Sequence, residues 1–212
     1  MTAAQIRASA RSVRVQSPAR WVNEVVTPEL VDLWLAQDRL DLVVIRGGTG
    51  LGKSWAVAQA VSHLTHVLVT THLIALVEQN AKLFGCRSYN DPTAKGGPKT
   101  VLLTAPRAST TLQSVHHARG REFARDVLVI DEVEQAFRRV VTGDHTPNER
   151  DARSRADRWR DILEIMGQVR LTIAMDAYAT QETLEMIARE AGLNPARCAL
   201  LEFTAAPPRG VA

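Results

Sequence analysis

The sequence predicts a three-layer α/β fold built around a mostly parallel sheet. Short apolar runs recur along the 212 residues, and each run is continuous rather than alternating, as in strands that are covered on both faces. Stretches with helical spacing separate these runs, which indicates consecutive βαβ units. The expected strands are residues 42–45, 67–69, 101–103, 127–130, 171–175 and 199–203.

The bulk composition indicates a globular protein with one large domain. The formal net charge of +3 permits a nucleic-acid partner but does not require one. Cys86 and Cys198 are far apart in the chain, so we expect reduced thiols and a cytoplasmic protein. No apolar run reaches the length of a membrane span, and the histidines lack the spacing of metal ligands.

We expect the chain to divide into an arm, a domain and a tail. Residues 1–22 contain arginines but no acidic residue, which predicts a basic, flexible arm with weak attraction for phosphate. A frayed terminus without a role explains the same composition. Residues 23–206 would form the domain, and residues 207–212 would form a flexible tail.

The segments between the strands contain patterns that predict helices and loops. A helix is expected to begin at Thr27-Pro28-Glu29, where a hydroxyl residue precedes a proline and an acid. Residues 85–100, with several Gly and Pro, are expected to form an exposed loop, and residues 142–151 a second loop. In the helix that follows, arginines alternate with acids, which favours a solvated face over a binding strip. Its apolar face is expected to carry Trp159, Ile162, Leu163 and Met166.

Residues 47–54 read Gly-Gly-Thr-Gly-Leu-Gly-Lys-Ser and match the phosphate-loop pattern G-x-x-x-x-G-K-[ST] between a strand and a helix. Glycines let a phosphate chain approach the backbone N–H groups, and the helix dipole favours the anion. We expect Lys53 to reach the β- and γ-phosphates and Ser54 to supply an oxygen to Mg²⁺. The predicted nucleotide-binding residues are Gly47, Gly48, Thr49, Gly50, Leu51, Gly52, Lys53, Ser54 and Trp55.

An acid pair, Asp131-Glu132, ends another apolar run. Carboxylates beside a buried strand cost free energy unless a cation is close. In a phosphate-loop protein that cation is hydrated Mg²⁺, held by Asp131, while Glu132 is placed to polarise the attacking water. The simpler alternative is that both acids cap the next helix.

The sequence also argues against two classes of phosphate-loop protein, the GTPases and the small-molecule kinases. A GTPase needs an Asn-Lys-x-Asp element to read guanine, and the sequence contains none. A small-molecule kinase avoids water attack and usually lacks a hydrolytic Glu beside the metal-binding Asp. The sequence therefore favours hydrolysis of ATP.

Over residues 40–190 the chain resembles the first motor domain, a RecA-like domain, of superfamily 2 helicases. The resemblance rests on four segments in this order: VIRGGTGLGKSWAVAQAV, HVLVTTHLIALVEQNAKLFG, VLVIDEVEQAF and LTIAMDAYATQETLEMI. It is nearest to the herpesvirus origin-binding protein and to plasmid and phage replication helicases whose second motif reads Asp-Glu-Val-Glu-Gln.

This resemblance implies a P-loop NTPase (RecA-like) fold, with ATP and Mg²⁺ as cofactors and single-stranded DNA as the nucleic-acid partner. It also implies that the strand ending at residue 175 lies between the phosphate-loop strand and the strand before Glu132. The roles it implies are catalytic for Lys53 and Glu132, metal-binding for Ser54 and Asp131, and nucleotide-binding for Asp176, which lies where such proteins link the γ-phosphate to movement of the nucleic acid.

The sequence departs from the family pattern at several places. Hydrophobic residues, Leu73 and Ile74, stand where relatives carry basic residues after His72. Contact of Thr71 and His72 with a nucleic-acid strand and an N-cap role for His72 are therefore both open. Tyr178 replaces the usual Thr or Asp, which alters the expected coupling. Residues 110–112 would touch the nucleic-acid backbone or start a helix.

A helicase also needs a second motor domain that supplies an arginine finger, and the sequence has room for one motor domain. Turnover by this domain alone should be slow. A partner chain, a replication protein or a missing part of a longer chain would complete the motor. The alternatives are an ATP switch that recruits a partner, and a ring-forming ATPase whose finger is Arg138, Arg139 or one of the arginines in residues 150–160.

Overall fold

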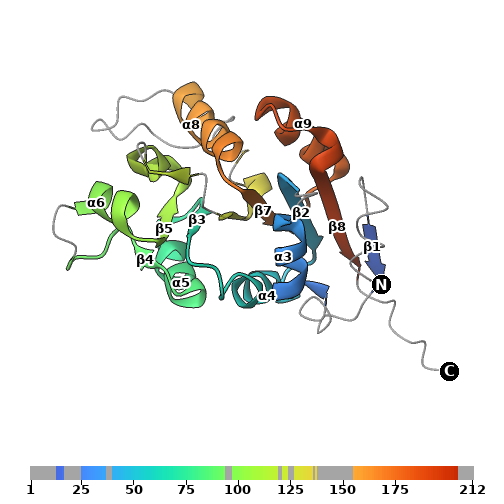
Figure 1. Ribbon diagram of the computed structural model, residues 1–212, viewed down its shortest axis with the longest axis horizontal. Helices are drawn as coiled ribbons and strands as arrows, with labels where there is room; N and C mark the ends of the chain where they lie inside the picture. The colour runs from blue at the N-terminus through green and yellow to red at the C-terminus, as the bar shows by residue number, and fades with distance from the viewer. Residues whose placement is uncertain are drawn as a thin grey trace.

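The described residues of the computed structural model are 13–16, 25–36, 40–93, 97–118, 121–123, 127–135, 137 and 155–204. Within them, eight strands form one sheet in the order β1-β8-β2-β7-β6-β3-β5-β4, and all the pairings are parallel (Figure 1). The strands are β1 (Val13–Gln16), β2 (Leu42–Gly47), β3 (Val67–Thr71), β4 (Arg87–Ser88), β5 (Arg107–Thr111), β6 (Val127–Asp131), β7 (Leu171–Asp176) and β8 (Cys198–Thr204).

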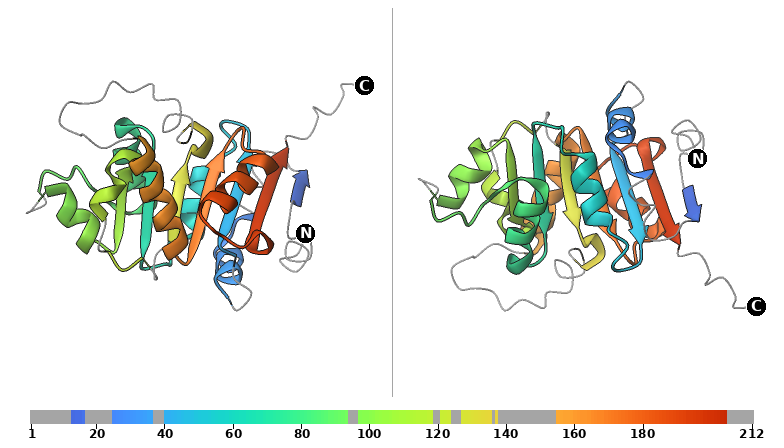
Figure 2. Two further views of the ribbon diagram at one scale, coloured as in Figure 1. Left: turned by 90° about the horizontal axis from the view of Figure 1, so that it is seen from above. Right: turned by 90° about the horizontal axis from the view of Figure 1, so that it is seen from below.

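Helices cover both faces of this sheet, which confirms the predicted three-layer α/β class. Figure 2 shows α3 and α4 over one face and α8 and α9 over the other. The helices are α3 (Pro28–Leu35), α4 (Lys53–Ala60), α5 (Ile74–Phe84), α6 (Gly97–Thr104), α8 (Arg155–Gln168) and α9 (Gln181–Glu190), with two 3₁₀ helices, η2 (Leu112–Ala118) and η4 (Pro195–Arg197).

The two faces of the sheet pack into two separate cores. On β6, Val127 and Val129 belong to the core beneath α3 and α4, whereas Leu128 and Ile130 belong to the core beneath α8 and α9. Successive side chains of a strand point to opposite faces, so a strand with a core on each side is apolar over most of its length. This explains why the apolar runs in the sequence are continuous.

Two of the predicted helices form as expected. Thr27 is the N-cap of α3, its Oγ1 accepts a hydrogen bond of 3.3 Å from the N–H of Leu30, and Pro28 is the first helical residue. On α8, Ile162 and Met166 are buried, and Trp159 and Leu163 pack against the same core. The apolar face predicted for that helix is therefore confirmed.

One predicted strand is wrong. Residues 101–103 lie in α6, and the strand at this place in the fold is β5, whose sequence is Arg-Ala-Ser-Thr-Thr. The hydroxyls of this strand are buried but bonded; Ser109 Oγ, for example, donates to the carbonyl of Val77 at 3.1 Å. A polar strand is stable inside the sheet when its side chains find backbone acceptors.

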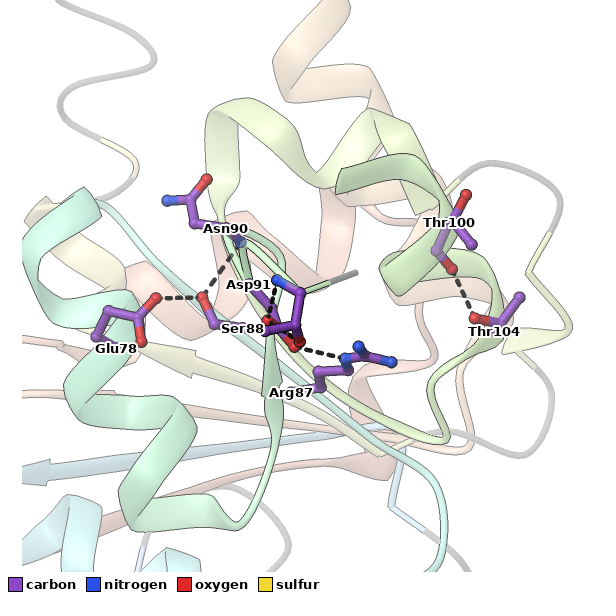
Figure 3. Close-up of polar contacts among 8 residues, drawn as sticks. Glu78, Arg87, Ser88, Asn90, Asp91, Thr100 and Thr104 are labelled. Atoms are coloured by element: carbon purple, nitrogen blue, oxygen red, sulfur yellow. Dashed lines mark hydrogen bonds and ion pairs between the residues drawn. The ribbon is translucent and has the colours of Figure 1, made fainter. Parts of the chain in front are cut away.

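The exposed loop expected at residues 85–100 is also wrong in part. β4 adds to the edge of the sheet there, and Tyr89 is buried with its N–H donating to the carbonyl of Ser109 at 2.9 Å. Figure 3 shows the polar contacts that hold this segment. Ser88 Oγ donates to Glu78 of α5 at 2.5 Å, and Arg87 Nε donates to Asp91 at 2.8 Å.

Near the N-terminus, residues 13–16 form β1 instead of part of a flexible arm, because their backbone pairs with the edge of β8. The remainder of residues 1–22, residues 207–212 and the expected loop at 142–151 lie outside the described residues. Arg138, Arg139 and Arg150 lie outside them as well.

Candidate nucleotide-binding site

The carboxyl ends of β2, β7 and β6 meet at the centre of one edge of the sheet. β2 leads into the phosphate-loop sequence, β7 ends at Asp176 and β6 ends at Asp131. β7 lies between the other two strands, as the sequence resemblance implies. In parallel α/β sheets, ligands bind outside the carboxyl ends of the strands.

The loop after β2 has the backbone conformation that its glycines permit. Gly50 and Gly52 have φ angles of 80° and 75°, in the left-handed region that side chains with a Cβ rarely adopt. Gly52 is the N-cap of α4, so the helix begins at Lys53. The first N–H groups of α4 have no partner within the helix and face the loop, which is the arrangement that binds anions.

Lys53 folds back over this loop. Its Nζ donates to the carbonyl of Gly47 at 2.5 Å and to that of Gly48 at 3.1 Å. Burial lowers the pKa of Lys53, while the carboxylates of Asp176, Asp131 and Glu132 act in the opposite direction. All three acids that the sequence singled out therefore act electrostatically on the Lys53 ammonium group.

Asp131 joins the two sequence motifs. Ser54 Oγ donates to its Oδ1 at 3.3 Å, and Asn80 of α5 donates to its Oδ2, also at 3.3 Å. Burial raises the pKa of Asp131, and the bonds from Asn80 and Ser54 and the charge of Lys53 partly oppose that rise. Sequence reasoning missed Asn80, because nothing in its helical context distinguishes it from an ordinary core position.

The side chains around Asp131 suit a hydrated Mg²⁺ ion. The Ser54 hydroxyl and the Asp131 carboxylate are hard oxygen donors of the kind that Mg²⁺ prefers, and a cation would favour the buried, charged form of Asp131. In the part of the chain that the structure describes, no group of three or more His, Cys, Asp or Glu could hold a metal ion. A magnesium ion here would need water or phosphate oxygens to complete its coordination.

Glu132 has an unusual backbone conformation. Its φ is 58°, and among the described residues it is the only one other than glycine with a positive φ. Such conformations are costly and cluster at functional sites. The Glu132 side chain is 40% exposed, and its Oε2 lies 3.1 Å from Nδ1 of His72, whose side chain is 2% exposed.

The predicted N-cap role of His72 is wrong. The N-cap of α5 is Leu73, and no side chain caps that helix. The helix-start interpretation of residues 110–112 fits the structure better, since Thr111 Oγ1 accepts a hydrogen bond of 3.2 Å from the N–H of Ser114 in η2. Thr110, Thr111 and Leu112 are at most 3% exposed.

Asp176 links the end of β7 to the segment after β6. Its Oδ2 accepts from the N–H of Glu134 at 2.9 Å, and its Oδ1 accepts from the N–H of Tyr178 at 2.7 Å. A displacement of one of these segments would therefore also displace the other. Tyr178 itself is 69% exposed, and Trp55, next to Ser54 on α4, is 49% exposed.

Neither a protein-family model nor a curated protein matches this chain. Solved structures do match it in fold. One is the crystal structure of a hypothetical ATP-dependent RNA helicase from Sulfolobus tokodaii, with a TM-score of 0.57 and 17% sequence identity. The match covers 87% of this chain and 53% of the helicase chain, so this chain spans about half the length of that protein. The likeness shows a shared RecA-like fold.

None of the described helices has the length and the apolar character needed to cross a bilayer.

Proposed function

We propose that this chain binds ATP with Mg²⁺ and hydrolyses it as a helicase-type motor domain. The hydrogen bond between Ser54 and Asp131 carries the proposal, because it joins two motifs that are 77 residues apart in the sequence. A phosphate loop and a strand-ending carboxylate that meet in this way form the phosphate and metal half of a P-loop active site. The RecA-like fold supports the same function.

The residues of the site have separate tasks in this proposal. The loop N–H groups and Lys53 bind the β- and γ-phosphates, with Lys53 exchanging its loop carbonyl partners for phosphate oxygens. Glu132 accepts a hydrogen bond from the water that attacks the γ-phosphate in line with the leaving oxygen. Ser54 and Asp131 would hold Mg²⁺, which when bound neutralises charge on the phosphate oxygens.

The nucleic-acid partner of the proposed motor is single-stranded, and we propose DNA on the basis of the sequence resemblance to replication helicases of plasmids and phages. The Sulfolobus tokodaii protein is described as an RNA helicase. The first experiment therefore includes both nucleic acids.

We also propose that the motor is completed by a second motor domain, since the chain covers 53% of the helicase that shares its fold. An ATP switch that recruits a replication partner is the second candidate. The half-exposed Glu132 favours the hydrolytic motor, because a binding switch needs no acid beside the γ-phosphate.

The test is steady-state ATP hydrolysis by the full chain, alone and with single-stranded DNA or RNA. Lys53→Ala and Glu132→Gln serve as controls. Trp55 fluorescence reports nucleotide binding separately, since this indole is half-exposed next to Ser54. We expect slow turnover that one nucleic acid stimulates and both substitutions abolish. Binding without turnover in the wild type would favour the switch, and failure to bind ATP would overturn both candidates.

A further inference from the structure

His72 and Glu132 lie side by side because of the register of two neighbouring strands. β3 and β6 pair in parallel, with Thr70 opposite Ile130. Continuing this register by two residues places His72 opposite Glu132, just beyond the end of each strand. The observed contact, 3.1 Å between Nδ1 and Oε2, agrees with this register.

The two positions continue one face of the sheet. Leu68 of β3 and Leu128 and Ile130 of β6 belong to the core beneath α8 and α9, and side chains two residues apart share a face. His72 follows this row and is 3% exposed. Asp131 belongs to the opposite face, where Ser54 and Asn80 hold it.

We propose that His72 is a positioning residue that fixes the carboxylate of Glu132 for water activation. This inference rests on the proposed ATPase function. A buried imidazole is confined by its surroundings, whereas a half-exposed glutamate has several rotamers open to it. The ion-pair contact of 3.1 Å with Nδ1 would hold one carboxylate oxygen and leave the other for the attacking water.

The expected effect is on turnover rather than on nucleotide affinity. His72 contacts Glu132, whereas the side-chain hydrogen bonds at the phosphate loop are made by Lys53 and Ser54. A misplacement of about 1 Å at a reacting group costs about a hundredfold in rate. We therefore expect removal of the Nδ1 contact to lower kcat about 10- to 100-fold and to leave the KM for ATP unchanged.

The test compares two substitutions that differ in whether they retain a donor. His72→Asn retains an N–H donor near the place of Nδ1, whereas His72→Leu removes it and keeps the core filled. His63→Leu is the matched control, because His63 also contacts an acid, Asp32, at 2.8 Å but follows the far end of α4. We expect kcat to fall in His72→Leu, to recover largely in His72→Asn, and to be unchanged in His63→Leu.

A double variant shows whether His72 acts through Glu132. Because Glu132→Gln should abolish steady-state turnover, its residual rate is measured in single-turnover hydrolysis, where adding His72→Leu should cause no further loss. Equal kcat in His72→Leu and the wild type, a rise in kcat, or a purely additive loss in the double variant would overturn the inference while leaving the ATPase proposal intact. A wild type that binds ATP but does not hydrolyse it would overturn both.

Discussion

At the scale of single residues, Gly52 is the position where backbone conformation and function meet most directly. Its φ of 75° is left-handed, and a Cβ built there would meet no atom within 4 Å. The left-handed φ, and no contact with a neighbouring atom, is therefore what disfavours a residue with a Cβ at this position. We expect Gly52→Ala to cost about 1 to 2 kcal/mol in unfolding free energy. It should also weaken ATP binding, because it shifts the loop that carries Lys53.

Gly192, after the end of α9, is a matched control for this prediction. Its φ is 66°, and a Cβ there would also meet nothing within 4 Å. Gly192→Ala should lower the unfolding free energy, measured with urea, by an amount similar to Gly52→Ala. Only Gly52→Ala should change the ATP titration of Trp55 fluorescence. Equal ATP affinity in the two variants would contradict the role given to the loop.

The two cysteines give a pH dependence with a defined sign. Burial raises the pKa of both the Cys86 thiol and the Cys198 thiol from 9.0 to about 11. Between these pH values the native state keeps protons that the unfolded state releases, so stability must fall as the pH rises. A shift of this size corresponds to at most about 3 kcal/mol for each thiol.

We therefore expect a Cys86→Ala, Cys198→Ala variant to lose less stability than the wild type between pH 9 and pH 11, where the thiols titrate. The measurement is the urea midpoint across this range. Comparing the two proteins cancels the titration of the lysines and tyrosines that they share. Parallel curves for the two proteins would show that the thiols do not contribute.

At the scale of whole elements, the sequence predicts apolar strands well and polar ones poorly. β2, β3, β6, β7 and β8 were expected because each needs apolar side chains on both faces. β5 was missed because its residues are polar: Ser109 satisfies its hydroxyl through a tertiary contact with Val77, and Thr111 accepts a bond from nearby Ser114. Residues 101–103 were assigned to a strand because a short apolar run does not distinguish a strand from a buried helix segment.

The candidate site likewise has residues that the sequence predicts and residues that it does not. The phosphate loop and the Asp131-Glu132 pair are local patterns with a physical reason for each residue, so the sequence alone predicts them. The contacts of Asn80 with Asp131 and of His72 with Glu132 depend on how β3 and α5 lie against β6. Strand order and register decide such contacts, and neither is written in a local pattern.

Arg107, the first residue of β5, binds the ends of two helical segments. Its guanidinium donates to the carbonyl of Val61 at 3.1 Å, to that of Phe84 at 3.2 Å and to that of Leu64. Carbonyl groups at helix ends lack partners within the helix, and a cation there is favourable. We expect Arg107→Ala to lower the unfolding free energy by about 2 kcal/mol, and Tm by about 4 to 8 °C.

The control for this prediction is Arg189→Ala on α9. Arg189 is 72% exposed, and its ion pair is with its neighbour Glu190 at 3.1 Å. Exposed pairs contribute little, so Tm should change by less than about 2 °C. A similar small effect for Arg107→Ala, measured by thermal unfolding, would show that solvent replaces the guanidinium at these carbonyls.

At the scale of the whole molecule, the site is built on the best-supported part of the sheet. β2, β7, β6 and β3 each have a strand on both sides and a core on both faces. Asp176 is the last residue of β7, and Lys53, His72 and Glu132 lie in the segments that directly follow β2, β3 and β6. The acids and the lysine are thus held by elements that move together, which limits their reorganisation when a charged ligand binds.

This arrangement predicts a gradient of hydrogen exchange across the sheet. Amides in β2, β7, β6 and β3 should exchange only by global unfolding, because no smaller opening exposes them. β4 has two residues at the edge and is held mainly by Ser88 and Arg87, so it should exchange by local opening. Native-state exchange at increasing urea separates the two classes. The gradient would be confirmed if the opening free energies of the β4 amides reached those of the central strands only at the global unfolding limit. If β7 exchanged as fast as β4, the centre of the sheet would not be the rigid base on which the site depends.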